Sequence, residues 1–308
     1  MARRKKQTQN PIISLIIVII LLFGYTIIEP DTKDESYSNK ETESSKSIKV
    51  NNIVTTDLQI HFLDVGQADS ILITNNNHSM LIDAGNNEDG KKIVTYLENL
   101  GITSLDYVVG THPHEDHIGG LDDVINNLSV KEIYLPEATT TTKTFEDVLD
   151  AIANKDLSLT VPTIGETFKL GEAEFEVIYT GTGTKDLNEA SIILKMIFGN
   201  HTYLFTGDTI EEVEKTILSE NINVDVLKVA HHGSKYSSCQ EFLDIATPDY
   251  AIISAGEGNS YGHPEEETLN RLKQFTNKIY VTKDLGTIIL TSNGSTIEIE
   301  TKQTDTNG

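Results

Sequence analysis

From residue 57 onward the chain alternates short apolar runs with amphipathic stretches, and this alternation constrains the fold more than any other feature. Runs such as LQIHF, SMLI, DYVV and TYLF have the length and the β-branched or aromatic content of buried strands. Stretches between them, such as GKKIVTYLENL and TFEDVLDAIA, carry apolar residues at helical spacing. Strands and helices mixed along the chain predict one α/β domain over residues 57–301, with residues 302–308 as a tail.

Two pairs of apolar runs are separated by short turn sequences and predict β-hairpins. One turn contains Gly199 and Asn200, and the other contains Asn293 and Gly294. Glycine and asparagine adopt the positive φ angles that tight hairpin turns require. Each pair of runs is therefore expected to form antiparallel neighbours in a sheet.

The N-terminal region has the pattern of a membrane anchor. Residues 11–28 contain no charged residue, and a helix of about 17–25 apolar residues crosses a bilayer. The basic residues in 1–10 predict a cytoplasmic tail and place the rest of the chain outside the cell. No A-x-A-like cleavage site follows, which favours a single-pass anchor in the cell membrane over a cleaved signal peptide. Residues 29–56 are polar and predict a disordered linker.

The overall charge is strongly acidic and limits the kinds of partner. The formal net charge is −23, and four of the positive charges lie in the first six residues. This composition argues against a broad basic surface for nucleic acid. It is compatible with metal ions that screen an anionic substrate.

The segment THPHEDHIGG follows the apolar run DYVVG and concentrates His112, His114, Asp116 and His117. Imidazole and carboxylate groups bind Zn²⁺, and additional carboxylates suit Mn²⁺. His112 and His114 point the same way in an extended stretch, so both can reach one ion. Asp116 and His117 lie a turn further on and are placed for a second ion. A single loop histidine is usually only a polar helix-capping residue, but three with an aspartate favour a metal site.

Other acids and histidines also follow apolar runs. Asp83 follows MLI, Asp208 follows YLFTG, and His231 follows VLKVA. Strand ends carry the functional loops of layered α/β proteins. We therefore expect these side chains to converge on one cleft with the segment THPHEDHIGG.

Together these residues resemble the metallo-β-lactamase superfamily, whose H-x-H-x-D-H signature is matched by His112 to His117. The resemblance implies an αββα sandwich that holds two divalent ions, Zn²⁺ or Mn²⁺, between the edges of its sheets. With the N-terminal region, the expected fold is this α/β sandwich preceded by one transmembrane helix. The metal ligands it implies are His112, His114, Asp116, His117, Asp208 and His231.

Four longer stretches, FLDVGQADSILI, GDTIEEVE, LKVAHHGSKYSS and YGHPEEETLNRL, resemble the extracellular hydrolase domain of ComEC-like competence DNA-uptake proteins. This resemblance implies a phosphodiester substrate in nucleic acid, with single-stranded DNA as a candidate. In that family a large membrane channel accompanies the hydrolase domain. A separate channel protein is therefore an expected partner, and the oligomeric state is left open.

The pattern departs from the superfamily at one ligand. A further metal-binding histidine usually lies between the signature and the bridging acid, but His201, in a hairpin turn, is the only histidine there. Asn188 and Ser191 stand where that histidine would fall. We expect the ion at His112 and His114 to be held weakly and the other ion more firmly.

Each remaining residue has an expected role. Asp116 would orient the attacking water as well as bind metal, and His263 or His232 would assist the leaving group. Neighbouring residues of an extended chain point apart, so His231 is taken as the ligand and His232 as its support. Substrate-contacting or ligand-supporting residues are Asp64, Gln67, Asp69, Asp83, Lys185, Asn188, Ser191, Ser234 and Ser237, the two serines as anion binders.

The expected activity is metal-assisted hydrolysis of a phosphodiester by a membrane-anchored extracellular domain. Nucleic acid is the first substrate class. Two alternatives stay open: a phosphodiester of an envelope glycopolymer, such as a phosphocholine ester of teichoic acid, and a catalytically degenerate domain that only binds its target.

Overall fold

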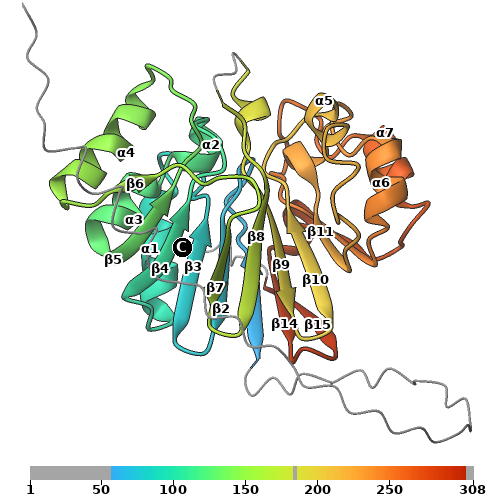
Figure 1. The fold of residues 1–308 in the computed structure, drawn as a ribbon, viewed down its shortest axis with the longest axis horizontal. Helices are drawn as coiled ribbons and strands as arrows, with labels where there is room; N and C mark the ends of the chain where they lie inside the picture. The colour runs from blue at the N-terminus through green and yellow to red at the C-terminus, as the bar shows by residue number, and fades with distance from the viewer. Residues whose placement is uncertain (1–56, 183–185, 303–308) are drawn as a thin grey trace, which may run out of the picture. The chain divides into compact units, whose positions relative to one another are not determined.

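The computed structural model describes residues 57–182 and 186–302. They form two β-sheets packed face to face, with helices on both outer surfaces (Figure 1). One sheet has 8 strands in the order β15-β14-β1-β2-β3-β4-β5-β6, and the other has 7 in the order β13-β12-β11-β10-β9-β8-β7. The predicted αββα sandwich is confirmed for this part of the chain.

The two sheets are built from short strands. The strands of the 8-stranded sheet are β1 (Leu58–Phe62), β2 (Ile71–Asn75), β3 (His78–Ile82), β4 (Ser104–Val109), β5 (Ser129–Tyr134), β6 (Leu159–Thr160), β14 (Thr287–Ser292) and β15 (Ile297–Lys302). The strands of the 7-stranded sheet are β7 (Thr167–Leu170), β8 (Ala173–Tyr179), β9 (Ile193–Phe198), β10 (His201–Phe205), β11 (Val226–Lys228), β12 (Tyr250–Ile253) and β13 (Ile279–Val281).

The helices lie mainly in the connections between parallel strands. They are α1 (Gly90–Asn99), α2 (Glu115–Ile118), α3 (Leu121–Asn127), α4 (Lys143–Asn154), α5 (Glu211–Glu214), α6 (Gln240–Ala246), α7 (Glu266–Leu272) and α8 (Thr282–Leu285), with 3₁₀ turns η2 (Asn188–Ala190) and η3 (Ala230–Gly233).

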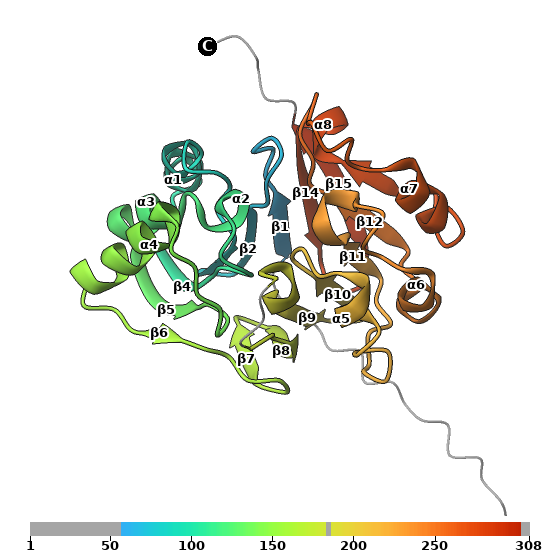
Figure 2. The ribbon, with the colours of Figure 1, turned by 90° about the horizontal axis from the view of Figure 1, so that it is seen from above.

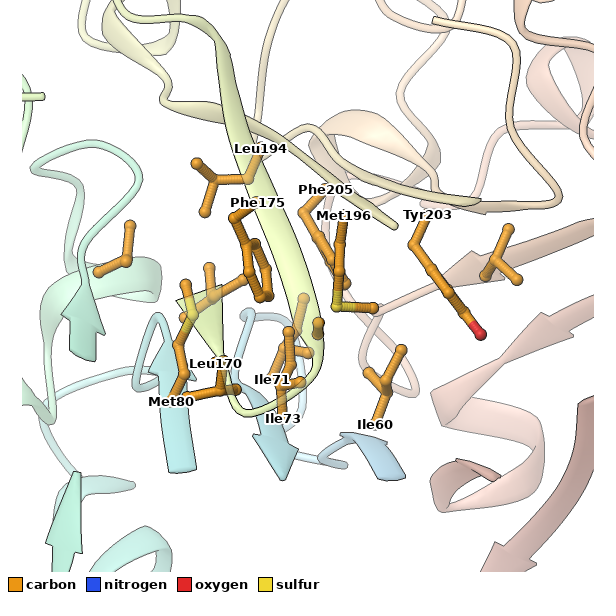
Figure 3. Packing of buried hydrophobic residues seen from close by; sticks show 14 of the residues in the cluster. Ile60, Ile71, Ile73, Met80, Leu170, Phe175, Leu194, Met196, Tyr203 and Phe205 are labelled. Carbon is orange, nitrogen blue, oxygen red and sulfur yellow. The ribbon is translucent and has the colours of Figure 1, made fainter. Parts of the chain in front are cut away.

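Three apolar layers hold the sandwich together. The central layer packs Ile60, Ile73 and Met80 of the 8-stranded sheet against Phe175 and Met196 of the 7-stranded sheet (Figure 3). Burying one such side chain is favourable by about 1.5–3 kcal/mol relative to leaving it exposed. In the outer layers, α1, α3 and α4 cover the 8-stranded sheet, and α6 and α7 cover the 7-stranded sheet (Figure 2).

Both predicted hairpins are present. β9 and β10 pair antiparallel around Gly199, whose φ is 60°, and Asn200. β14 and β15 also pair antiparallel, and the side chain of Asn293 accepts hydrogen bonds from the backbone of Ser295 and Thr296 in their turn. Gly199, Asn200 and Asn293 thus lie in hairpin turns, as the sequence predicted.

Parallel strands in each sheet direct the functional loops to one edge. β3, β4 and β5 are parallel neighbours, as are β10, β11, β12 and β13. The loops after β3, β4, β10, β11 and β12 therefore leave the same end of their sheets. The loop between β1 and β2 lies at the same edge as these loops, because Ile71 at the start of β2 pairs with Ile82 at the end of β3.

The predicted cytoplasmic tail, membrane anchor and linker, residues 1–10, 11–28 and 29–56, lie outside the described residues. So does most of the predicted C-terminal tail. Among the described residues, no helix is both long and apolar enough to span a bilayer. The domain boundaries at these positions stay predictions.

A buried glutamate, Glu214, caps the start of α6 on the outer side of the 7-stranded sheet. Its carboxylate accepts hydrogen bonds from the backbone N–H groups of Ser238 (2.6 Å) and Cys239 (2.8 Å). Burial raises the pKa of Glu214 from 4.5 to about 7, and these two hydrogen bonds offset burial only in part. At a pH between these two values, Glu214 is therefore protonated in the folded protein and ionised in the unfolded chain.

This pKa makes stability depend on pH. Between pH 4.5 and pH 7 the folded state binds more protons than the unfolded state, so the free energy of unfolding falls as pH rises. Over that pH range the free energy of unfolding falls by about 3 kcal/mol. Urea unfolding at pH 5 and pH 8 should show this loss, and Glu214→Gln should reduce the pH dependence by that amount, while the exposed control Glu241→Gln keeps it in full. An unchanged pH slope in Glu214→Gln would contradict this assignment.

Candidate metal centre

The loop after β3 and the loop after β4 are joined by backbone hydrogen bonds. The N–H of Ala84 donates to the carbonyl of His117 (2.7 Å), and that of Gly119 donates to Gly85 (2.9 Å). A Cβ atom on Gly120 would lie 2.4 Å from the carbonyl oxygen of Ala84, so only glycine fits there. The two glycines that end THPHEDHIGG therefore hold the histidine segment against the Asp83 loop.

Four side chains from both sheets converge at this edge: Asp116, His117, Asp208 and His232. His117 Nε2 lies 3.2 Å from Asp208 Oδ1, and His232 Nε2 lies 3.3 Å from both Asp208 Oδ2 and Asp116 Oδ2. Asp116 and His117 lie on α2, whereas Asp208 follows β10 and His232 lies in η3. Each half of the sandwich thus supplies two of the four groups.

The spacing of these atoms fits a divalent metal ion. Zn²⁺ bonds to nitrogen and oxygen are about 2.0–2.2 Å long, so the ligands of a tetrahedral ion lie about 3.3–3.6 Å apart. The closest distances in the cluster, 3.2 and 3.3 Å, match that value. His117 Nε2, Asp208 Oδ1 and His232 Nε2 are buried, and none has a satisfying hydrogen bond from another described residue. A metal ion would satisfy all three.

Hydrogen bonds orient both histidine rings toward this point. His117 Nδ1 lies 2.8 Å from Asp83 Oδ2, and His232 Nδ1 lies 3.0 Å from the carbonyl oxygen of Ser254. Because a carboxylate or carbonyl oxygen only accepts, Nδ1 carries the hydrogen in each ring. The Nε2 lone pairs are then free to bind a metal, an arrangement typical of metal-ligating histidines.

The charges around the cluster favour a cation at its centre. Burial alone lowers the pKa of His232, but the carboxylates of Asp208 and Asp116 outweigh burial and raise this pKa to about 10. The pKa of His117 is also well above its usual value, because Asp208, Asp83 and Asp116 outweigh its burial. Without a metal, the two rings hold protons as counter-charges. Metal binding would replace those protons.

His112 and His114 form a second, smaller pair. His112 Nε2 lies 2.9 Å from His114 Nδ1, and His112 Nδ1 lies 3.2 Å from the hydroxyl oxygen of Thr111. That hydroxyl donates to Asp83 (2.7 Å), so its oxygen can accept from His112. The two metal-binding clusters found among the described residues include neither His112 nor His114. The weaker ion expected at this pair stays a prediction.

The structure favours His232 rather than His231 for the ligand position, contrary to the sequence-based assignment. His231 Nε2 lies 3.8 Å from Asp208, and the His231 side chain is 24% exposed, compared with 2% for His232. The extended geometry assumed for the pair is wrong, because both residues have left-handed backbone angles, with φ of 53° and 54°. Such strained angles cluster at functional sites. Metal binding by either ring stays a prediction.

A buried ion pair lies behind the cluster. Lys228 Nζ contacts Asp69 Oδ2, and both side chains are 1% exposed. The ammonium group also donates to the carbonyl of Gly207 (3.3 Å), next to Asp208, and the hydroxyl of Ser191 accepts from the Asp208 backbone (3.2 Å). Asp69 and Ser191 therefore lie next to the cluster, and their predicted role of supporting the ligands stays a prediction. The role of Lys228 was missed, although a lysine within the apolar run VLKVA was its signal.

An open cleft of about 570 Å³ lies over the cluster. Gln67, Asn188 and His263 line it, as the sequence predicted. Gln67 Oε1 accepts from the backbone of Gly256 (3.1 Å), so its Nε2 faces His263 Nδ1 at 3.4 Å. Burial, with smaller contributions from His232 and His231, lowers the pKa of His263 to about 4. A neutral His263 whose Nδ1 accepts can donate a hydrogen bond from Nε2.

Four predicted site residues are not placed at the cleft by the structure. Asp64 lines a separate hollow between β14 and α1. Ser234 and Ser237 are both buried. Ser237 donates its hydroxyl hydrogen to the carbonyl of Thr209 (2.7 Å), so it cannot donate it to an anion, whereas the Ser234 hydroxyl accepts from the backbone N–H of Tyr236 (3.3 Å). Lys185 lies outside the described residues. His201 lies at the start of β10, at the opposite end of that strand from Asp208.

The Asp83→Asn substitution tests how His117 is oriented. An asparagine keeps the shape but presents an N–H group to His117 Nδ1, which forces the ring hydrogen onto Nε2 and removes the metal-binding lone pair. We expect metal affinity to fall about 10- to 100-fold. Isothermal titration with Mn²⁺ or Zn²⁺ measures this. Asp106→Asn is the matched control, because Asp106 pairs with a histidine on the surface, His78 (3.2 Å). Equal metal affinities in the two variants would refute the role of Asp83.

The fold is similar to that of a solved structure. The metallo-beta-lactamase fold protein YhfI from Bacillus subtilis superposes with a TM-score of 0.50 at 14% identity, over 76% of this chain and 100% of that one. At this identity the likeness shows the fold alone. Two sheets, their flanking helices and a histidine-rich loop after the fourth strand define a metallo-hydrolase type of domain.

Residues 63–257 match the model of the metallo-beta-lactamase superfamily, and the chain belongs to that superfamily. It is 30% identical over 251 residues to ComE operon protein 3 of Bacillus subtilis, a match covering 75% of this chain and 32% of the relative. It is 26% identical over 252 residues to Recombination protein 2 of Haemophilus influenzae, covering 80% and 30%. The chain thus spans about a third of the length of these relatives.

Proposed function

We propose that this chain is a metal-dependent phosphodiesterase that acts on nucleic acid from outside the cell, anchored to the membrane by residues 11–28. The observation that carries the proposal is the convergence of Asp116, His117, Asp208 and His232 below an open cleft. The name of one relative, Recombination protein 2, associates that protein with recombination, which supports a nucleic-acid substrate. Because those relatives are much longer, a separate channel protein is the partner we propose.

In this proposal each cleft residue has a defined task. A divalent ion bound by the cluster, Zn²⁺ or Mn²⁺, supplies Lewis acidity and makes a water molecule more acidic. The Asp116 carboxylate is 32% exposed and faces the cleft, so it can orient that water. His263, held by Gln67, donates a hydrogen bond to a substrate oxygen. The amide of Asn188 offers a further contact from the opposite side of the cleft.

The test uses the full-length chain with labelled single-stranded DNA and, separately, a chromogenic phosphodiester. Reactions contain Mn²⁺, Zn²⁺ or EDTA. Metal-dependent cleavage of both substrates is the expected result. Cleavage of the small ester alone, with DNA intact under every metal, would exclude the nuclease and favour the glycopolymer esterase. No metal in elemental analysis and no hydrolysis of either substrate would indicate a degenerate binding domain.

A further inference from the structure

The described lining of the cleft is poor in the basic side chains that would hold a polyanion. Among its lining residues in the described part of the chain there is no lysine or arginine. Glu88, Glu115 and Asp116 add negative charge instead. Proteins that bind nucleic acid mainly through phosphates depend on lysine and arginine. The described lining residues therefore offer a nucleic-acid substrate contacts other than ion pairs with lysine or arginine.

One lining residue has the chemistry for such a contact. Tyr261 is 69% exposed, the largest exposed fraction among the large apolar or aromatic side chains of the described residues. Its ring lies nearly parallel to that of His263, with centroids 5.5 Å apart and an angle of 20°. The His263 ring is in turn nearly parallel to that of the metal-site residue His232, at 6.3 Å and 26°. The rings of Tyr261, His263 and His232 thus follow one another from the rim of the cleft to the candidate metal site.

The loop that carries Tyr261 is fixed before any ligand arrives. The side chain of Asn259 donates to the carbonyls of Gly256 (2.8 Å) and His263 (2.7 Å) and accepts from the His263 backbone N–H (2.9 Å). Lys283 also donates to the His263 carbonyl (3.1 Å). A platform that is ordered in advance loses little conformational entropy on binding. The backbone on both sides of Tyr261 is therefore held in place, and its ring packs against that of His263.

We propose that Tyr261 is a stacking platform for a nucleobase and selects single-stranded nucleic acid, an inference that rests on the proposed phosphodiesterase function. An unpaired base presents a flat π face, which stacks on an aromatic ring whatever the sequence. A nucleotide has its base and phosphate at opposite ends, which matches an aromatic ring at the rim and metal ligands at the floor. A polyol-phosphate polymer presents no such face.

The experiment compares two substrates of equal length and charge: oligothymidylate and an abasic oligonucleotide with the same phosphodiester backbone. For the full-length chain, Tyr261→Ala should raise KM for oligothymidylate roughly 5- to 150-fold. It should leave kcat and the KM for the abasic strand unchanged, and Tyr261→Phe should behave like the wild type. Tyr236→Ala is the matched control, because Tyr236 is 64% exposed but does not line the cleft.

Binding of phosphorothioate versions of both strands, which resist cleavage, is followed by fluorescence anisotropy. Tyr261-dependent preference for bases in this assay supports the stacking platform even if the wild-type chain cleaves no DNA, in which case only the phosphodiesterase proposal fails. An equal effect of Tyr261→Ala on both strands would reveal a purely structural role and overturn the inference. So would a Tyr261-dependent interaction with glycerol-phosphate polymer that oligothymidylate does not share.

Discussion

Asp208→Asn should abolish metal binding at the main site and lower phosphodiester hydrolysis at least about 100-fold. Losing a residue that only supports a ligand already costs about 10- to 100-fold, and Asp208 lies directly between the two histidines. Its two oxygens lie 3.2 Å from His117 and 3.3 Å from His232, so the amide loses both the charge and one acceptor. The measurements are metal content per chain after dialysis and the rate of chromogenic ester hydrolysis in Mn²⁺.

The control for this variant is Asp150→Asn, which makes the same change of charge on the exposed surface of α4. Circular dichroism of both variants checks that the fold is retained. Asp208→Asn preserves the side-chain shape, so a loss of structure is not expected. Wild-type metal content in Asp208→Asn would show that the ion lies elsewhere and would remove the basis of the proposed mechanism.

His232→Ala should have a comparably large effect, whereas His231→Ala should lower activity less than about tenfold. His232 has its Nδ1 bound to the Ser254 carbonyl and its Nε2 aimed at Asp116 and Asp208, which is the arrangement of a ligand. His231 is further from Asp208 and lines the cleft. We therefore expect His232→Ala to lose the more firmly held ion and His231→Ala to retain it.

Because the two residues are neighbours with the same unusual backbone angles, each variant is the matched control for the other. Elemental analysis and the KM of the chromogenic ester distinguish the roles, since a substrate contact changes KM without changing metal content. The reverse result, with metal lost only in His231→Ala, would restore the ligand assignment made from the sequence. Equal loss in both variants would indicate that the η3 turn itself had collapsed.

Much of the fold is predictable from the sequence, because local patterns agree with the tertiary structure. The apolar runs became strands since their side chains fill the layers on both faces of each sheet, and the glycine and asparagine turns closed the hairpins. Asp83 and Asp208 lie where strand-end reasoning placed them. The H-x-H-x-D-H spacing likewise brought His117 and Asp116 to the edge between the sheets.

The sequence-based expectations and the structure differ for one physical reason: the direction of a side chain depends on backbone angles and packing, which composition does not reveal. The choice between His231 and His232 assumed extended geometry, whereas both residues have left-handed backbone angles and His232 lies nearer to Asp208. Ser234 and Ser237 had the residue type of an anion site, but both are buried away from the cleft lining, and Ser237 donates its hydroxyl hydrogen to the backbone carbonyl of Thr209. Tyr261 could not be recognised from its sequence, because exposure above a cleft is a tertiary property.

The cluster of Asp116, His117, Asp208 and His232 is divided evenly between the two sheets, and this division affects how well the protein resists proteolysis. Asp116 and His117 belong to one half of the sandwich, and Asp208 and His232 belong to the other. An ion bound by all four would act as a cross-link at the edge where the functional loops meet. Metal starvation would then shorten the lifetime of the protein against proteases as well as stop its chemistry, so its abundance would follow the metal supply of its surroundings.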